Sequence, residues 1–176
     1  MATDANPTAA YDLAVLMRDC VLARFTAVGL PAPDRAIVTV GQIAWDECPC
    51  GQLAVTLVEM FPAETFPTFT LRGSIRCPPG LWIAHYTVEM LRCASGSSGT
   101  GTPPTPAALA SDALLAVKDA HAVRAGVRCC LEVEGAAARI IQFGVGRQLM
   151  VGPQGGCVGS DLDVYIALAG CLCPAI

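Results

Sequence analysis

The 176-residue chain has the length of one folded domain, since domains commonly contain about 100–200 residues. Hydrophobic residues make up 53% of it and charged residues only 15%, against about 25% charged residues in a typical soluble domain. The net charge is −4, Lys118 is the single lysine among eleven basic residues, and the sequence has no basic cluster. An electrostatic footprint for nucleic acid is therefore excluded.

The apolar excess requires a covered surface, either in a membrane or between protein subunits. A membrane helix needs about 20 consecutive apolar residues, and the most apolar runs, 53–58 and 162–168, have only the length of strands. We therefore expect subunit contacts and no membrane segment. Residues 1–4 show neither a basic start nor an apolar region, so we also expect no secretory leader and folding in a cytoplasm.

The first predicted helix spans residues 7–28. Asn6 and Pro7 have the character of a cap and a first helical position, and an apolar stripe then recurs at helical spacing: Ala14, Met17, Val21, Phe25 and Val28. Gly29 is placed to end the helix in a left-handed conformation.

Three strands are predicted next, at residues 37–40, 52–60 and 81–91. Leu53, Val55 and Leu57 share one face of the second strand. In the third, two faces alternate, one with Trp82, Ala84, Tyr86, Val88 and Met90, the other with Ile83, His85, Thr87 and Glu89. This alternation is typical of an antiparallel strand with one buried side.

A second helix is predicted from Thr105, as the cap of Pro106, to about residue 131. Its packed face is expected to hold Leu109, Ala113, Ala116, Ala120, Val123 and Val127. Short strands at 139–144, 149–151 and 162–168 follow, and the glycines of 152–159 predict a structured turn. The order of elements predicts an α+β fold over residues 1–176, with two helices packed on one face of a mainly antiparallel sheet.

Two loops are candidates for contact with a partner. Residues 61–80 are rich in proline and carry Phe61, Phe66 and Phe69, whereas 95–104 is a flexible stretch that includes Ser97, Gly99 and Gly101. We expect both loops to project from the sheet, because long aromatic or flexible loops are poor candidates for an isolated core.

Ten cysteines are present, yet their spacing does not predict a zinc site. The closest pairs are separated by one residue (48 and 50, 171 and 173) or by none (129 and 130), rather than by the two to four residues that zinc ligand pairs favour. Cys20 and Cys130, on the predicted helices, are expected to be small buried hydrophobic residues. For the cysteines in loops, disulfides and free thiols remain equal alternatives.

No set of residues predicts catalysis or a cofactor. His85 on a strand and His121 within a helix have no orienting carboxylate nearby in sequence, since Asp119 lies on another helical face from His121. Asp161 and Asp163 at a strand start are typical of a solvated edge. The sequence also lacks the residue spacings that a calcium-binding loop and a nucleotide-binding loop require. We expect no enzyme, no metal and no cofactor.

The whole chain resembles the tail-terminator proteins of long-tailed phages that infect actinobacteria. The resemblance is carried by residues 43–53 (IAWDECPCGQL), 88–94 (VEMLRCA), 152–159 (GPQGGCVG) and 171–174 (CLCP). It implies two helices against a mixed or antiparallel sheet and a structural protein of the virion neck, assembled in the host cytoplasm. It also implies a hexameric ring that caps the tail tube protein, ends tube polymerisation and joins the head connector or head-closure protein.

In such a ring, DNA passes through the lumen without specific binding, and the negative net charge opposes its adhesion. A ring-forming head–tail connector or head-closure protein is the nearest alternative. A small cysteine hydrolase and a host-encoded zinc-binding module are more distant ones.

Overall fold

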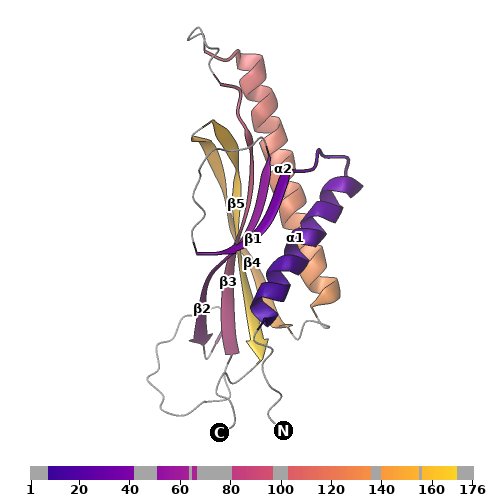
Figure 1. Cartoon of the computed structure of the whole chain (residues 1–176), viewed down its shortest axis with the longest axis vertical. Helices are drawn as coiled ribbons and strands as arrows, with labels where there is room; N and C mark the ends of the chain where they lie inside the picture. The colour runs from indigo at the N-terminus through magenta and orange to yellow at the C-terminus, as the bar shows by residue number, and fades with distance from the viewer. Residues whose placement is uncertain are drawn as a thin grey trace.

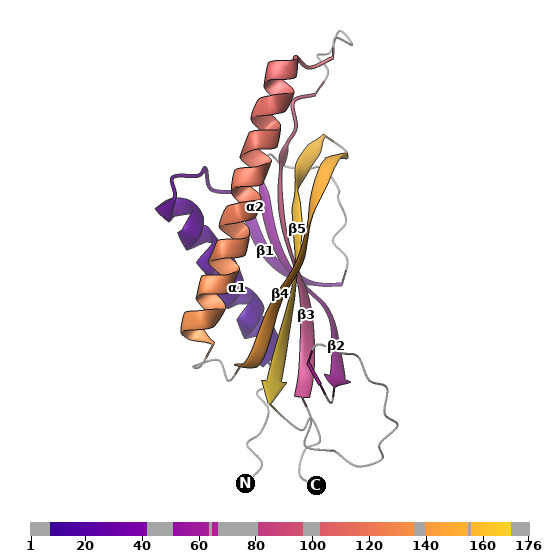
Figure 2. The same ribbon diagram turned by 180° about the vertical axis from the view of Figure 1, so that it is seen from behind.

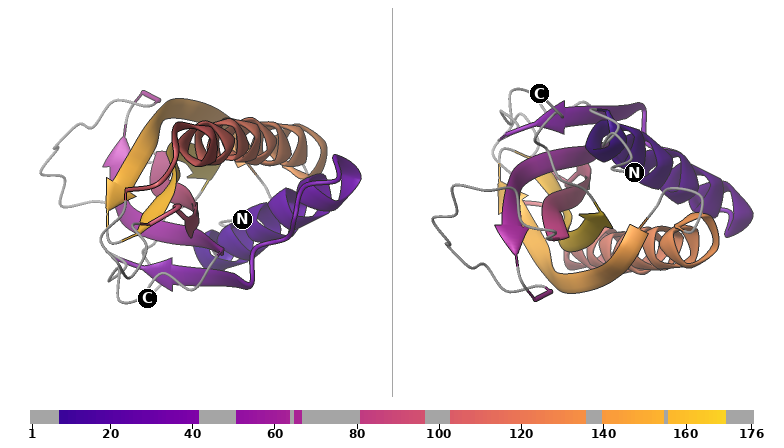
Figure 3. Two further views of the ribbon diagram at one scale, coloured as in Figure 1. Left: turned by 90° about the horizontal axis from the view of Figure 1, so that it is seen from above. Right: turned by 90° about the horizontal axis from the view of Figure 1, so that it is seen from below.

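The computed structural model describes residues 8–41, 51–63, 65–66, 81–96, 103–135, 140–154 and 156–169. Within them lie α1 (Ala9–Ala27), β1 (Arg35–Val40), β2 (Gln52–Ala63), β3 (Leu81–Cys93), α2 (Pro106–Glu134), β4 (Ile140–Gln154) and β5 (Cys157–Ala169). The strands form one sheet in the order β1-β2-β3-β5-β4. β1 pairs with β2 in parallel and the other three pairings are antiparallel. Both helices cover the same side of the sheet (Figure 1, Figure 3), which confirms the predicted α+β architecture.

The first helix follows its predicted apolar stripe. Four of the five predicted residues are buried in the main core: Ala14, Met17, Val21 and Phe25. Val28 is the exception, because the helix has already ended there and the side chain is 44% exposed. Gly29 has a φ of +69° and ends the helix as predicted. The predicted cap at residues 6–7 lies outside the described residues.

The second helix begins as predicted, with the Thr105 side chain accepting a hydrogen bond from the amide of Ala108. The prediction was wrong for its first turns. Leu109 and Ala113 are exposed, and burial starts at Ala116, because the N-terminal part of α2 extends past the ends of β4 and β5 (Figure 1, Figure 2). Of the two described helices, neither combines the length and the apolar character needed to cross a membrane.

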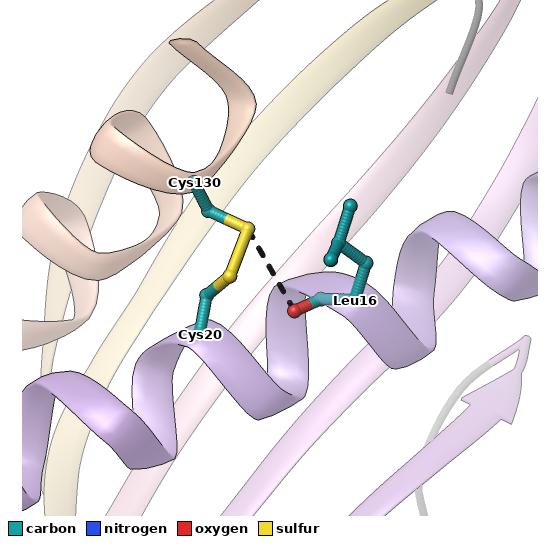
Figure 4. The surroundings of a disulfide bond; sticks show 3 residues. All are labelled: Leu16, Cys20 and Cys130. Atoms are coloured by element: carbon teal, nitrogen blue, oxygen red, sulfur yellow. Dashed lines mark hydrogen bonds between the residues drawn. A yellow bond between two sulfur atoms is a disulfide. The ribbon is translucent and has the colours of Figure 1, made fainter. Parts of the chain in front are cut away.

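The two helices cross at close range. A Cβ atom on Gly126 of α2 would lie 3.1 Å from the Cα of Val21 in α1, so the missing side chain permits this approach. Nearby, Cys20 and Cys130 form a disulfide with their Cα atoms 5.9 Å apart (Figure 4). The expectation that these two residues are unpaired buried thiols was wrong. The sequence placed both residues on the predicted helices but could not give their distance across the interface.

Two further cysteines, Cys93 of β3 and Cys157 of β5, are also disulfide-bonded, and they lie opposite each other in the strand register. Cys129 is an exposed free thiol. The other cysteines lie outside the described residues. For Cys93 and Cys157, the structure therefore favours the disulfide alternative.

The strands show the predicted alternation but are longer than predicted. The expected face of β3 lies in or against the main core, together with alternate residues of β2 and β5. The two short strands predicted at 139–144 and 149–151 are one strand, β4, whose register against β5 shifts at three places. These shifts interrupt the alternation that sequence periodicity detects. Within the predicted turn at 152–159, Gly156 has the positive φ, +80°, while 152–154 and 157–159 belong to β4 and β5.

Buried polar contacts connect the layers. Arg92 of β3 forms an ion pair with Asp119 of α2, whose side chain is 2% exposed, and also donates to the carbonyl of Pro31. Tyr86 of β3 donates through its hydroxyl to the carbonyl of Ala10 in α1, at 2.8 Å. These bonds fix both helices against the middle of the sheet.

Candidate functional site

The face of the sheet that points away from the helices carries a contiguous group of polar residues, here called the polar band. Their neighbours along β2, β3 and β5 point into the core beneath the helices, so alternation places the band on the opposite face. Eight residues form it: Thr56, Glu59, His85, Thr87, Glu89, Asp161, Asp163 and Tyr165.

The strand register arranges the polar band in three rows across the sheet. One row pairs Glu89 with Asp161, the next runs Thr56, Thr87 and Asp163, and the third runs Glu59, His85 and Tyr165. Residues that face each other in a sheet have Cβ atoms about 5 Å apart, so the polar groups form one surface.

His85 connects two carboxylates of the polar band. Its Nε2 lies 3.2 Å from Asp163 Oδ1, and its Nδ1 lies 3.4 Å from Glu59 Oε1. The first contact has hydrogen-bond geometry, whereas Nδ1 has no hydrogen-bond partner. The imidazole also stacks on the Tyr165 ring, with centroids 4.4 Å apart and planes 9° from parallel. The ring orientation is therefore fixed from three sides, and a protonated imidazole would be attracted by both carboxylates.

Glu89 and Asp161 form a half-buried pair of acids. Burial, followed by the charge of Asp161 and the hydrogen bond between the two, raises the pKa of Glu89 to about 7. Burial and the charge of Asp163 likewise raise the pKa of Asp161. Two carboxyl groups this close share a proton most readily, because desolvation and mutual repulsion both oppose the doubly ionised state. Near neutral pH the pair therefore takes up or releases a proton.

Two oxygen atoms of the polar band are buried without a hydrogen-bond partner, Thr56 Oγ1 and Asp161 Oδ1. Thr56 is itself only 3% exposed. Buried polar atoms in folded proteins are nearly always paired, since an unpaired one costs about 1–3 kcal/mol. Both oxygen atoms therefore lack a hydrogen-bond partner within the subunit.

In the part of the chain that the structure describes, neither a free thiol nor a metal-ligand group lies at the polar band. The described free thiol, Cys129, lies on α2, on the other side of the sheet from His85. Among the described residues, no group of three or more His, Cys, Asp or Glu side chains is placed to hold a metal ion. What the band offers is negative charge, hydrogen-bond acceptors and one readily exchanged proton.

Two of the aromatic residues expected to project as a loop lie next to the polar band instead. Phe61 belongs to β2 and is 7% exposed, packed with Ala63 and Ile83 in a small second core. Phe66 and Tyr165 pack against that core. The expectation of a projecting Phe61 was wrong because β2 continues to residue 63 and turns this ring toward the apolar side chain of its cross-strand partner.

Phe66 lies over β4 at a glycine. A Cβ atom on Gly144 would stand 3.3 Å from the Phe66 ring, so a glycine at this position leaves room for the aromatic side chain. Phe66 is partly exposed. The remaining candidate contact residues, Phe69, Ser97, Gly99 and Gly101, lie outside the described residues.

Sequence patterns identified some members of the polar band but did not show that these residues lie together. His85, Thr87 and Glu89 share a face in the predicted third strand, and Asp161 and Asp163 were noted at a strand start. Glu59 and Tyr165 were missed as polar neighbours, because only the register of three strands brings them to His85. No protein-family model matches the chain, and no curated protein matches it either.

Proposed function

We propose that this chain is a structural subunit of a phage tail, a tail terminator that assembles into a ring. The ring caps the tail tube, ends its polymerisation and joins it to the head connector in the virion neck. The proposal starts from the resemblance of residues 43–53, 88–94, 152–159 and 171–174 to such proteins, and the two-layer α+β fold is compatible with it.

The observation that carries the proposal is the set of large apolar side chains that this fold leaves exposed. Among the described residues, four of them lie on α1, just after it or on β2: Tyr11, Val28, Val58 and Met60. The other eight occur on α2 and on both edge strands: Leu109, Leu114, Val117 and Val133 on α2, Val40 on β1, and Ile141, Leu149 and Met150 on β4. Exposures in this second group range from 45% for Leu149 to 73% for Val133. A monomer gains nothing from so many apolar groups in water, whereas an assembly covers them.

Most of the second group lies on α2 and β4, and Val40 lies on β1 at the opposite edge of the sheet. β1 forms one edge, with α1 beside it, and β4 forms the other, with α2 beside it (Figure 2). A subunit with two different adhesive surfaces makes a heterologous contact, which produces a closed ring when the rotation between neighbours closes. The ring number of six comes from the resemblance.

Mass measurement of the purified chain, combined with negative-stain imaging, tests the ring. A sixfold ring supports the proposal, and a stable monomer or an open filament contradicts it. Addition of the ring to polymerising tube protein tests the terminator role, since a terminator halts tube growth and is retained on tube ends. Capture by the portal-side connector without any binding to tube protein would instead assign the chain to head closure.

A further inference from the structure

The outer face of α2 is basic in its central part. Lys118, Arg124 and Arg128 are exposed. Arg124 and Arg128 lie one turn apart, with Arg124 at the border with β4, whereas Lys118 lies further round the exposed surface of the helix. Between residues 113 and 131 the single acid is Asp119, which is buried against Arg92. Just beyond this segment, Glu132 compensates part of the positive charge, because it pairs with Arg128.

Two of the three basic groups already have partners within the subunit. Arg128 pairs with Glu132 one turn further along α2, but both side chains are at least half exposed, and such pairs contribute less than about 1 kcal/mol. Arg124 donates to the carbonyls of Val145 and Gly146, which holds its guanidinium beside β4. Leu114 and Val117, each 57% exposed, lie on the same outer face.

The polar band has the opposite charge on the opposite side of the subunit. It contains four carboxyl groups and one imidazole. Burial and the charges of Asp163 and Glu59 raise the pKa of Tyr165, and the positive charge of Arg147 on β4 acts in the opposite direction. Thr56 adds an independent sign of a missing partner, because this almost completely buried side chain has an unpaired oxygen within the band. Leu149, opposite Asp161 in the register, gives the band an exposed apolar border.

We propose that the outer face of α2 in one copy of the chain docks on the polar band of a second copy. Lysine and arginine side chains then meet carboxylates, while Leu114 and Val117 cover apolar side chains at the border of the band. Every copy carries both surfaces on different layers of the fold, so the contact is head-to-tail. This inference rests on the proposed ring and names the contact that builds it.

A charge-swap experiment on the full chain tests the contact. A base-reversed variant carries Lys118→Glu with Arg128→Glu, and an acid-reversed variant carries Glu59→Lys with Glu89→Lys. A matched control, Asp19→Lys with Asp34→Lys, gives the same net change as the acid-reversed variant at exposed positions of α1 and the α1–β1 connection. Sedimentation measures assembly as a function of concentration, and circular dichroism verifies that each variant folds.

We expect each reversed variant alone to need at least about a hundredfold higher concentration for assembly, because like charges then meet across the contact. An equimolar mixture should assemble within about threefold of the wild type, in particles that alternate the two variants. The control should assemble as the wild type does. If Glu59→Lys with Glu89→Lys fails to fold, Glu59→Lys alone, at a 57% exposed side chain, replaces it with a smaller expected loss of about tenfold.

The outcomes separate the two proposals. A wild-type monomer at all concentrations overturns both the ring and this contact. A wild-type ring whose folded reversed variants assemble normally, or fail to assemble when mixed, overturns the α2–band contact and leaves the ring in place.

Discussion

Removal of the Cys20–Cys130 disulfide should strongly destabilise the chain. The bond joins α1 to α2 across a sequence separation of 110 residues. In the chain-entropy description, closing a loop of that size lowers the entropy of the unfolded chain by an amount worth about 4.8 kcal/mol at 25 °C. We expect the Cys20→Ala/Cys130→Ala variant to lose about 3–5 kcal/mol, since the smaller side chains also leave space beside the close contact at Gly126.

Urea unfolding under non-reducing conditions measures this loss. For a domain of this size, each kcal/mol also lowers the melting temperature by roughly 2–4 °C, so a fall of about 10 °C should accompany it. The matched control is Cys129→Ala, at an exposed free thiol on the adjacent residue, which should change the unfolding free energy by less than about 0.5 kcal/mol. A double variant within about 1 kcal/mol of the wild type would refute the reasoning, as would peptide mapping that pairs Cys20 elsewhere.

Three further changes test the packing and the charge of the fold by chemical denaturation. Asp119→Ala should cost about 3 kcal/mol or more because it leaves Arg92 buried without its carboxylate, whereas Asp119→Asn should retain part of the contact. Tyr86→Phe should cost about 1–2 kcal/mol, since the carbonyl of Ala10 loses its donor. Glu89→Gln should reduce the loss of unfolding free energy that the wild type shows as the pH rises from 4.5 to 7. The folded state raises this pKa, so it binds more protons than the unfolded chain in that window, and the wild type loses about 1–2 kcal/mol there after allowance for screening.

The helix side of the sheet could be predicted from the sequence because its signals are local. The stripe of α1 and the alternation of β3 each identify a buried face within one element. Leu109 shows the limit of such signals: its spacing fits the packed stripe of α2, yet the sheet ends before reaching it. How far one element extends over another depends on tertiary arrangement, which periodicity does not contain.

The polar side of the sheet depends on register between strands far apart in sequence. His85 meets Asp163 across a separation of 78 residues. The irregularities near Val58 in β2 and within β4 each change which residues face one another, and no local pattern indicates them. The same holds for Cys20 and Cys130, whose helical positions were predicted but whose pairing was not.

The shared proton of Glu89 and Asp161 gives the proposed contact a distinctive pH dependence. A lysine or arginine from a neighbouring copy would favour the ionised carboxylates and lower the pKa of Glu89 from about 7. Assembly should then release protons near neutral pH and become stronger as the pH rises from 6 to 8. Stability of the isolated subunit changes in the opposite direction, because ionisation of the same group is unfavourable without the partner cation.

Sedimentation of the wild type at several pH values, together with calorimetry in buffers of different ionisation enthalpy, measures the proton release directly. Glu89→Gln is the matched variant, since the amide keeps the size of the side chain but cannot titrate. It should reduce the pH dependence of assembly, leaving the contribution of Asp161. Assembly that weakens as the pH rises, or a Glu89→Gln variant with the full wild-type pH dependence, would show that the carboxyl pair does not meet a cation in the ring. Subunit stability and assembly should therefore depend on pH in opposite directions if the band is covered by a neighbouring copy. If the band faces solvent in the ring, assembly releases no protons from it.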